Sequence, residues 1–407
     1  MIRTIKLTQA FKDFFRNEKA GAIILIICTV ASLIVANSPA GTDYIAFWRV
    51  YLGPLSLEHW VNDGLMAIFF LLIGLELERE IYSGELSSVK SALLPIFAAL
   101  GGLFLPAAIH FALNTGMPTQ AGVGIPMATD IAFAIGVLAL VGNRIPASLK
   151  VFLVALAVMD DLGAILVIAI FYTAKLSVAY LLGAAAVVTV LIVMNRVFRV
   201  RFLAPYLIGG MLMWYLMLRS GVHATIAGVV LAFTIPFTRI RDDPHGPSQR
   251  LEHFLHKPVA FLILPIFALA NTGLAVGGDW AASLASPNSL GIMLGLLAGK
   301  PIGILIASFV AVSLGFCRLP HDLNWRHVLG AGMLGGIGFT MSIFITNLAY
   351  PLEQQMIDSS KMAIFIASLA AGLLGLIFLK MFGGPKPEDP DVDSMYFDDE
   401  ADAQPSL

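Results

Sequence analysis

Charged residues are scarce in this chain of 407 residues. Asp, Glu, Lys and Arg make up 13% of the sequence and hydrophobic residues 58%, whereas an ordinary soluble domain has about 25% charged residues. The mean hydropathy is correspondingly high, at +0.85. Because one soluble core cannot bury so much apolar surface, the composition excludes a soluble enzyme, a nucleic-acid-binding protein and a disordered chain.

Cysteine is also scarce, since the sequence contains only Cys28 and Cys317. Two cysteines this far apart provide none of the short spacings that bind a metal or support redox chemistry. The sequence therefore predicts no metal or redox site built from cysteines.

Long apolar runs are abundant instead, and many reach the length of about 17–25 residues that crosses a bilayer. Glycine, proline and charged residues divide them into twelve candidate spans. Their limits are 20–37, 59–80, 92–113, 121–143, 148–173, 178–198, 203–218, 221–237, 257–274, 287–315, 327–349 and 360–382. The connections are mostly short, so we expect an all-α polytopic membrane protein whose transmembrane part, residues 20–382, is one domain.

Basic residues lie mainly on one side of these spans. If the N-terminus is cytoplasmic, 20 of the 25 Lys and Arg residues fall in inside segments, 4 fall in outside segments, and Lys300 lies within a span. Cytoplasmic loops are enriched in Lys and Arg, so this distribution predicts that both termini are cytoplasmic.

The two ends of the chain differ from the membrane part. Residues 1–19 place apolar side chains at helical spacing among basic ones, which predicts an interfacial N-terminal helix, with a cleavable signal peptide as the weaker alternative. Residues 383–407 contain eight acidic residues and one basic residue without an apolar face. This composition predicts a disordered acidic cytoplasmic tail that either aids solubility or binds a partner.

Four charged residues lie near the middle of predicted spans, where a charge is costly and usually functional. They are Asp130 in the fourth span, Asp160 and Asp161 in the fifth, and Lys300 in the tenth.

The adjacent pair Asp160 and Asp161 suits ion exchange. Neighbours on a helix point about 100° apart, so both can border one cavity. Burial and mutual repulsion oppose two negative charges, so the pair should titrate as a coupled unit. Two carboxylates also supply the oxygen ligands that a small hard cation prefers. The alternative is a structural salt bridge of one aspartate with Lys300, which leaves the second aspartate unexplained.

Glycine and proline interrupt two of the spans. Gly122, Gly124 and Pro126 precede Asp130 in the fourth span, and residues 330–340 of the eleventh contain five glycines. Two interrupted spans are typical of discontinuous helices around a site near the midplane, where an aspartate can offset positive helix ends and a lysine negative ones. Close helix packing through small residues is the alternative explanation.

Several long stretches resemble the NhaA-type sodium/proton antiporters of bacterial inner membranes. They are WVNDGLMAIFFLLIGLELERE at 60–80, IPMATDIAFAIGVLALVG at 125–142, VFLVALAVMDDLGAI at 151–165, SGVHATIAGV at 220–229, RLEHFLHK at 250–257, GKPIGI at 299–304 and GGIGFTMSIFI at 335–345.

This resemblance implies inverted-topology repeats, with the fourth and eleventh spans crossing as broken helices at the midplane. Asp160 and Asp161 would be the cation- and proton-binding carboxylates, facing a cytoplasmic funnel. Thr129 and Asp130 would border the crossing, and Lys300 would pair with Asp160 and balance the half-helix dipoles.

The resemblance also implies a function and a setting. The protein would be a pH-regulated, electrogenic antiporter that extrudes Na+ or Li+ in exchange for more than one external H+ by alternating access. It would span the bacterial inner membrane as a homodimer. Apart from these ions and the lipid bilayer, no cofactor and no nucleic acid would be bound.

Further residues match the pH-response positions of that family: Glu76, Arg79, Glu80, Glu252, His253 and His256. His223, near the external end of span eight, and Gly338 are additional pH-response candidates, with a structural role as the equal alternative for His223. Snorkelling charges at the end of span two and solvated histidines are the plain alternatives. Gln249 stands where the family often has a basic residue, which leaves the pH profile open.

Three rival classes explain less of the sequence. An intramembrane aspartyl protease needs a Gly-x-Gly-Asp motif, and the nearest segment, residues 276–279, begins with valine. A membrane prenyltransferase needs Asp-Asp-x-x-Asp, which residues 160–164 lack. A sodium-coupled symporter of a small organic substrate needs aromatic or amide groups that the central segments mostly lack.

Overall fold

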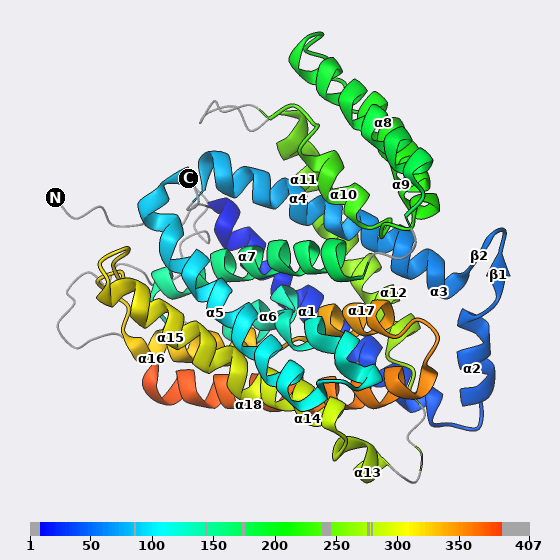
Figure 1. The fold of residues 1–407 in the computed structure, drawn as a ribbon. Coiled ribbons are helices and arrows are strands. Elements are labelled where there is room, and N and C mark those ends of the chain that lie inside the picture. Colours follow the sequence, from blue (N-terminus) through cyan, green and yellow to red (C-terminus); the bar gives the residue numbers. More distant parts are fainter. Residues whose placement is uncertain are drawn as a thin grey trace, which may run out of the picture.

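The computed structural model describes residues 9–84, 87–142, 145–172, 176–237, 246–274, 277 and 280–384. These residues are mostly helical, and the long helices run side by side (Figure 1). A hairpin of β1 (Tyr51–Leu52) and β2 (Leu55–Ser56) projects at one end of the molecule. The start of α1 (Gln9–Ala36) and the end of α18 (Gln354–Phe382) lie at the opposite end.

Seven of the described segments are straight, long and apolar enough to cross a membrane, and the number rises to ten if three bent helix pairs each form one span. The seven are Leu57–Ser83, Ala92–Asn114 in α5 (Val89–Asn114), α7 (Ala147–Phe171), α8 (Val178–Arg196), Pro247–Asn271, Pro287–Ser313 and α18. The chain is therefore a polytopic α-helical membrane protein, as its composition predicts.

The three bent pairs each contain a short break. They are Ala20–Ala36 of α1 with α2 (Gly41–Trp48), η3 (Pro118–Met127) with α6 (Ile131–Val141), and α16 (Trp325–Gly335) with α17 (Phe339–Ala349). The bends are 119°, 42° and 48°, respectively. The second and third pairs coincide with the glycine- and proline-interrupted spans of the sequence.

Three long segments combine α-helix with a π-helical turn. They are α3 (Leu57–His59), η1 (Trp60–Leu65) and α4 (Met66–Ser83); α11 (Pro247–Pro258), η4 (Val259–Ile263) and α12 (Leu264–Asn271); and α14 (Pro287–Leu294), η5 (Gly295–Gly299) and α15 (Lys300–Ser313). Such turns are frequent at functional sites, and η5 ends directly before Lys300.

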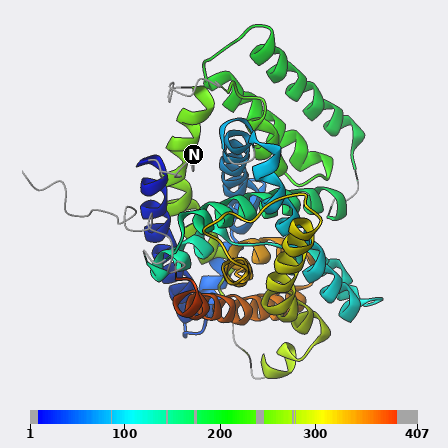
Figure 2. The same cartoon turned by 90° about the vertical axis from the view of Figure 1, so that its left-hand side faces the viewer.

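Two of the twelve predicted spans correspond to short helices. The helix α9 (Ala204–Ser220) has 17 residues and α10 (Ile226–Ala232) has 7. A Gly221 in the left-handed conformation separates them. Both lie with α8 at one edge of the molecule, and α8 is mostly exposed (Figures 1 and 2). The remaining short helix is α13 (Trp280–Leu284).

The first helix differs in extent from the sequence-based prediction. α1 runs unbroken from Gln9 to Ala36, so the described part of the segment 1–19 continues directly into the first span. Residues 1–8 and 385–407, which include nearly all of the predicted acidic tail, lie outside the described residues.

Helices α5 and α15 approach each other closely because glycine faces glycine. A Cβ atom at Gly101 would overlap the carbonyl oxygen of Gly303, and one at Gly303 would overlap that of Gly101. A Cβ atom at Gly102 would lie 3.5 Å from Cε of Lys300. This small-residue contact holds the start of α15, and with it Lys300, against α5.

Candidate ion-binding site

The breaks of two bent helix pairs lie against each other. The N–H of Asp130 donates to the carbonyl oxygen of Ile337 over 2.7 Å, and the hydroxyl of Thr129 lies 2.8 Å from the carbonyl oxygen of Gly335. Residues at each break thus form hydrogen bonds with the other break, where backbone groups lack partners within a helix. Buried backbone groups need such partners.

Asp130 lies at two helix N-termini. Its buried carboxylate accepts a hydrogen bond from the N–H of Phe133 in α6 and another from the N–H of Thr340 in α17, both over 3.0 Å. The hydroxyl of Thr340 donates to it as well, over 2.5 Å. The positive ends of both half-helices therefore stabilise this negative charge.

Lys300 lies at a helix end of the opposite sign. Its ammonium group donates to the carbonyl oxygen of Met127, the last residue of η3. It also forms an ion pair with Asp160, in which Nζ and Oδ2 are 2.7 Å apart and both side chains are fully buried. The negative end of η3 and one aspartate together compensate this buried positive charge.

The carboxylates of Asp160 and Asp161 are only partly satisfied. The residues are 0% and 1% exposed. Oδ2 of Asp160 contacts Lys300 and accepts a hydrogen bond from Thr129 over 2.6 Å. Its Oδ1 and both oxygens of Asp161 have no hydrogen-bond partner among the residues that the structure describes. Buried oxygens of this kind are suited to a proton or a small cation.

The hydroxyl of Thr129 has two acceptors within reach, Asp160 and the carbonyl of Gly335. It carries one hydrogen, so it fully satisfies only one of them at a time. With Asp160 ionised, Thr129 can donate to the carboxylate. With Asp160 protonated, the acid can donate to Thr129 and Thr129 to Gly335. The hydrogen-bond direction here therefore follows the protonation of Asp160.

A second cluster of charges lies where α4 meets α11. Nε of Arg79 donates to Oε1 of Glu252 over 2.8 Å, and the guanidinium also pairs with Glu80 at 2.8 Å. Nε2 of His256 lies 3.6 Å from Oε1 of Glu76 and 3.8 Å from Oε1 of Glu252. The structure thus brings five of the predicted pH-response residues into one network.

Glu78 also belongs to this cluster, although the sequence-based prediction of pH-response residues omits it. It is buried and accepts a hydrogen bond from the hydroxyl of Ser248 over 2.9 Å. Glu78 lies near Glu76 and Glu80 at the same end of span two, but residues two apart on a helix face different directions, so helical spacing alone does not predict its contact with Ser248. Only the packing of the start of α11 against α4 shows it.

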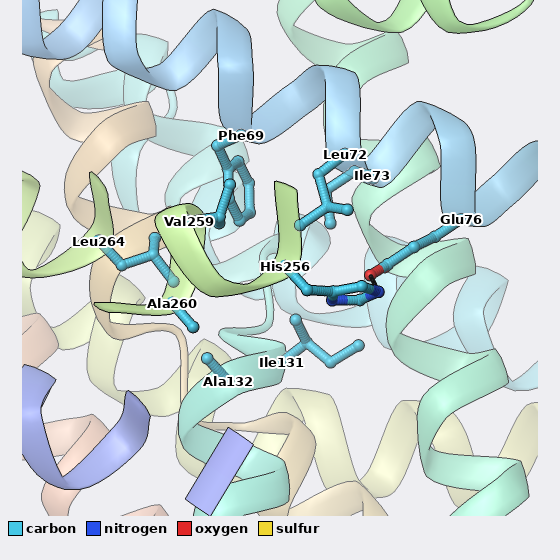
Figure 3. A pocket seen from close by; sticks show the side chains of 10 residues that line it. All are labelled: Phe69, Leu72, Ile73, Glu76, Ile131, Ala132, His256, Val259, Ala260 and Leu264. Carbon is cyan, nitrogen blue, oxygen red and sulfur yellow. Dashed lines mark ion pairs between the residues drawn. The ribbon is translucent and has the colours of Figure 1, made fainter. Parts of the chain in front are cut away.

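A small cavity of about 30 Å³ separates this charge cluster from the start of α6. Glu76 and His256 lie at one side of it, joined by their ion pair, and apolar side chains of α4, η4 and α12 line the other side (Figure 3). Ile131 and Ala132 also line it, directly after Asp130. The volume is enough for a water molecule.

Three predicted pH-response residues lie apart from this network. His253 is exposed although it is on the same helix as His256. Nε2 of His223 lies 2.7 Å from the carbonyl oxygen of Tyr172, beyond the end of α7. Gly338 directly precedes α17, and a Cβ atom there would overlap the hydroxyl of Ser342.

A helical membrane protein with charged residues buried between interrupted helices has the architecture of a secondary transporter. The profile of the family described as Na+/H+ antiporter 1 matches residues 12–379. The chain belongs to this family of sodium/proton antiporters, and this membership decides against the protease and prenyltransferase alternatives.

Individual relatives are similar over nearly their whole length. The Na(+)/H(+) antiporter NhaA of Dechloromonas aromatica is 65% identical over 377 residues, which are 93% of this chain and 97% of the relative. The NhaA of Cytophaga hutchinsonii is 60% identical over 377 residues, 93% and 96% of the two chains. NhaA 1 of Flavobacterium johnsoniae is 58% identical over 376 residues, 92% and 98%.

Proposed function

We propose that this protein extrudes Na+ or Li+ from the cytoplasm in exchange for external protons. The observation that carries the proposal is the buried pair Asp160 and Asp161, in which three carboxylate oxygens have no hydrogen-bond partner among the described residues. These oxygens suit a small cation when both groups are ionised, and protons when they are not.

The same pair supports electrogenic exchange. Two carboxylates can take up two protons, whereas a monovalent cation carries one charge. Lys300 either keeps its ion pair with Asp160 throughout the transport cycle or loses this ion pair when Asp160 is protonated. Exchanging more than one proton for one cation moves net charge, so a membrane potential would drive the cycle together with the proton gradient.

The proposed transport fold has twelve spans, with α9 and α10 supplying the seventh and eighth. The pairs η3–α6 and α16–α17 are its two discontinuous helices, which cross at the midplane within inverted repeats. We place both termini in the cytoplasm of a bacterium, on the basis of the distribution of Lys and Arg. The transporter would lie in the inner membrane as a homodimer and alternate access by moving these half-helices.

The proposed regulation by cytoplasmic pH rests on the charge cluster of α4 and α11. Glu76, Arg79, Glu80, Glu252 and His256 form its network. Three buried glutamates share one guanidinium and one imidazole there, and the buried Glu78 adjoins them through α4. The proton content of such a cluster depends on pH, and a change in it would alter the packing around the cavity beside α6.

The test uses purified protein in liposomes with an imposed pH gradient. Addition of NaCl or LiCl should dissipate the gradient at alkaline pH, and choline chloride should not. Setting a membrane potential with valinomycin and potassium should change the rate if exchange is electrogenic. A gradient that survives both sodium and lithium at alkaline pH would refute the proposed function.

A further inference from the structure

The outer half-helix η3 depends on side chains from elsewhere in the fold. It is a 3-10 helix of ten residues, although such helices rarely exceed about four residues. Four of its carbonyl oxygens accept hydrogen bonds from other elements: Thr119 from Tyr350, Ala121 from Tyr172, Ile125 from Ser342 and Met127 from Lys300.

Two tyrosine hydroxyls contact η3 between Thr119 and Gly124. The hydroxyl of Tyr172 donates to Ala121 over 2.7 Å and accepts a hydrogen bond from the N–H of Gly124 over 3.2 Å. The hydroxyl of Tyr350 donates to the carbonyl oxygen of Thr119 over 2.8 Å. Tyr172 directly follows α7, and Tyr350 directly follows α17.

Two glycines allow these hydroxyls to reach the backbone. A Cβ atom at Gly122 would overlap the hydroxyl of Tyr350, and one at Gly124 would lie 2.8 Å from that of Tyr172. These contacts explain the two glycines without reference to helix packing, because any side chain at either position would displace a tyrosine.

Both tyrosines are themselves anchored. The hydroxyl of Tyr350 lies 3.0 Å from Oδ1 of Asn288 in α14, and Asn288 donates to Ser360 of α18 over 2.8 Å. His110 of α5 contacts the same oxygen of Asn288 over 3.1 Å. The carbonyl oxygen of Tyr172 forms a hydrogen bond with Nε2 of His223. Each hydroxyl thus ties η3 to neighbouring helices.

The far end of η3 reaches the ion site. Met127 binds Lys300, and Thr129, two residues on, binds Asp160. A shift of η3 therefore changes the surroundings of Lys300 and Thr129, which both contact Asp160. In the proposed topology η3 is the external half of the fourth span, so it lies between the pair and the outside.

Resting on the proposed function, we propose that Tyr172 and Tyr350 form a clamp on η3 that sets how readily the carboxylate pair opens to the external side. They are positioning residues, since neither contacts Asp160 or Asp161. Any conformation in which η3 moves away must give up these bonds. Removing a hydroxyl therefore favours the outward-open state by the free energy of its bonds.

The test replaces each tyrosine with phenylalanine, which removes only the hydroxyl. In liposomes of known orientation, Tyr172→Phe and Tyr350→Phe should lower the external KM for Na+ about threefold to tenfold. The cytoplasmic KM should stay unchanged or rise, because a shift between two states changes the two faces in opposite directions. The control is Tyr206→Phe, which removes the hydroxyl of a buried tyrosine that likewise donates to a backbone carbonyl oxygen, that of Val200, over 2.9 Å.

A second measurement does not need transport. Hydrogen–deuterium exchange of the peptide covering 118–127 should rise in both variants and stay at the wild-type level in Tyr206→Phe. A lower maximal rate with unchanged KM values and unchanged deuterium uptake would overturn the clamp and leave the antiport function intact. Wild-type protein without cation-dependent exchange, but with faster deuterium uptake in the variants, would refute the function and keep the clamp.

Discussion

At the scale of single residues, Asp161 is the unusual group of the site. Both of its carboxylate oxygens are buried without a donor among the described residues, whereas Asp160 has Lys300 and Thr129. A buried carboxylate without partners is costly when ionised, so it should hold a proton or adjoin a cation. In the proposed exchange, Asp161 would therefore be the group whose occupant changes.

Asp161→Asn keeps the shape of the side chain and removes its ability to ionise. We expect the rate of exchange in liposomes to fall at least about a hundredfold, because the proposed exchange needs this group to ionise. The melting temperature should be unchanged or higher, because a buried unpaired charge is gone. Asp43→Asn, at an exposed position of α2, is the control. Exchange above a tenth of the wild-type rate would contradict the role of Asp161.

At the scale of elements, one carboxylate joins two helices. Asp130 caps both α6 and α17, and its own N–H binds the break of the other helix pair. The crossing of the two interrupted pairs therefore depends on this residue in addition to apolar packing such as that of Phe133 on Phe339.

Asp130→Ala should lower the free energy of unfolding by about 2–4 kcal/mol, since two helix caps are lost and buried N–H groups remain unpaired. Thermal unfolding in detergent measures this, with Asp63→Ala as a comparison on another helix. Asp130→Asn should recover part of the loss because the amide oxygen still accepts. An Asp130→Ala protein as stable as the wild type would show that the crossing does not need the cap.

The contact of α5 with α15 gives a second prediction for elements. Gly101→Ala places a methyl group against the carbonyl of Gly303, so the helices must separate, at a cost of about 1–3 kcal/mol. Gly183→Ala is the matched control, because its Cβ would make an ordinary 3.5 Å contact with Leu216. Equal melting temperatures for the two variants would contradict this close packing.

At the scale of the whole molecule, the charge cluster and the candidate ion site are separate but adjoin through α6. The cavity between them is lined by Glu76 and His256 on one side and by Ile131 and Ala132 on the other. A rearrangement of the cluster can therefore reach the helix start that Asp130 caps without a direct contact between the charges.

His256→Gln removes the positive charge that this imidazole carries when it is protonated. Losing this charge makes release of protons from the neighbouring glutamates less favourable, so we expect the pH of half-maximal exchange to rise by roughly 0.5–1 unit. Rates of sodium-dependent proton release across a pH series measure the shift. His253→Gln, at an exposed position of the same helix, is the control and should leave the midpoint in place. An unshifted midpoint in His256→Gln would remove the histidine from the regulation.

The sequence by itself determined the membrane fold class and pointed to the site. The length of an apolar run and the position of a charge within it are local properties, and the energetic penalty of lipid makes both informative. Asp130, Asp160, Asp161 and Lys300 stand out for this reason. The interruptions at 128–130 and 336–338 likewise follow from local glycine and proline.

The resemblance implied the pairing of Lys300 with Asp160, but only the tertiary structure decided the other contacts of these groups. The N–H of Thr340 binds a carboxylate 210 residues away, and Ser248 binds Glu78 across 170 residues. The two tyrosines reach η3 from the ends of other helices. Local sequence carries no information on such pairs, because they depend on how helices pack and on which backbone groups a break leaves unpaired. The apolar pattern thus set what lies in the membrane, and helix packing set which buried charges are compensated and which carboxylate oxygens have no partner among the described residues.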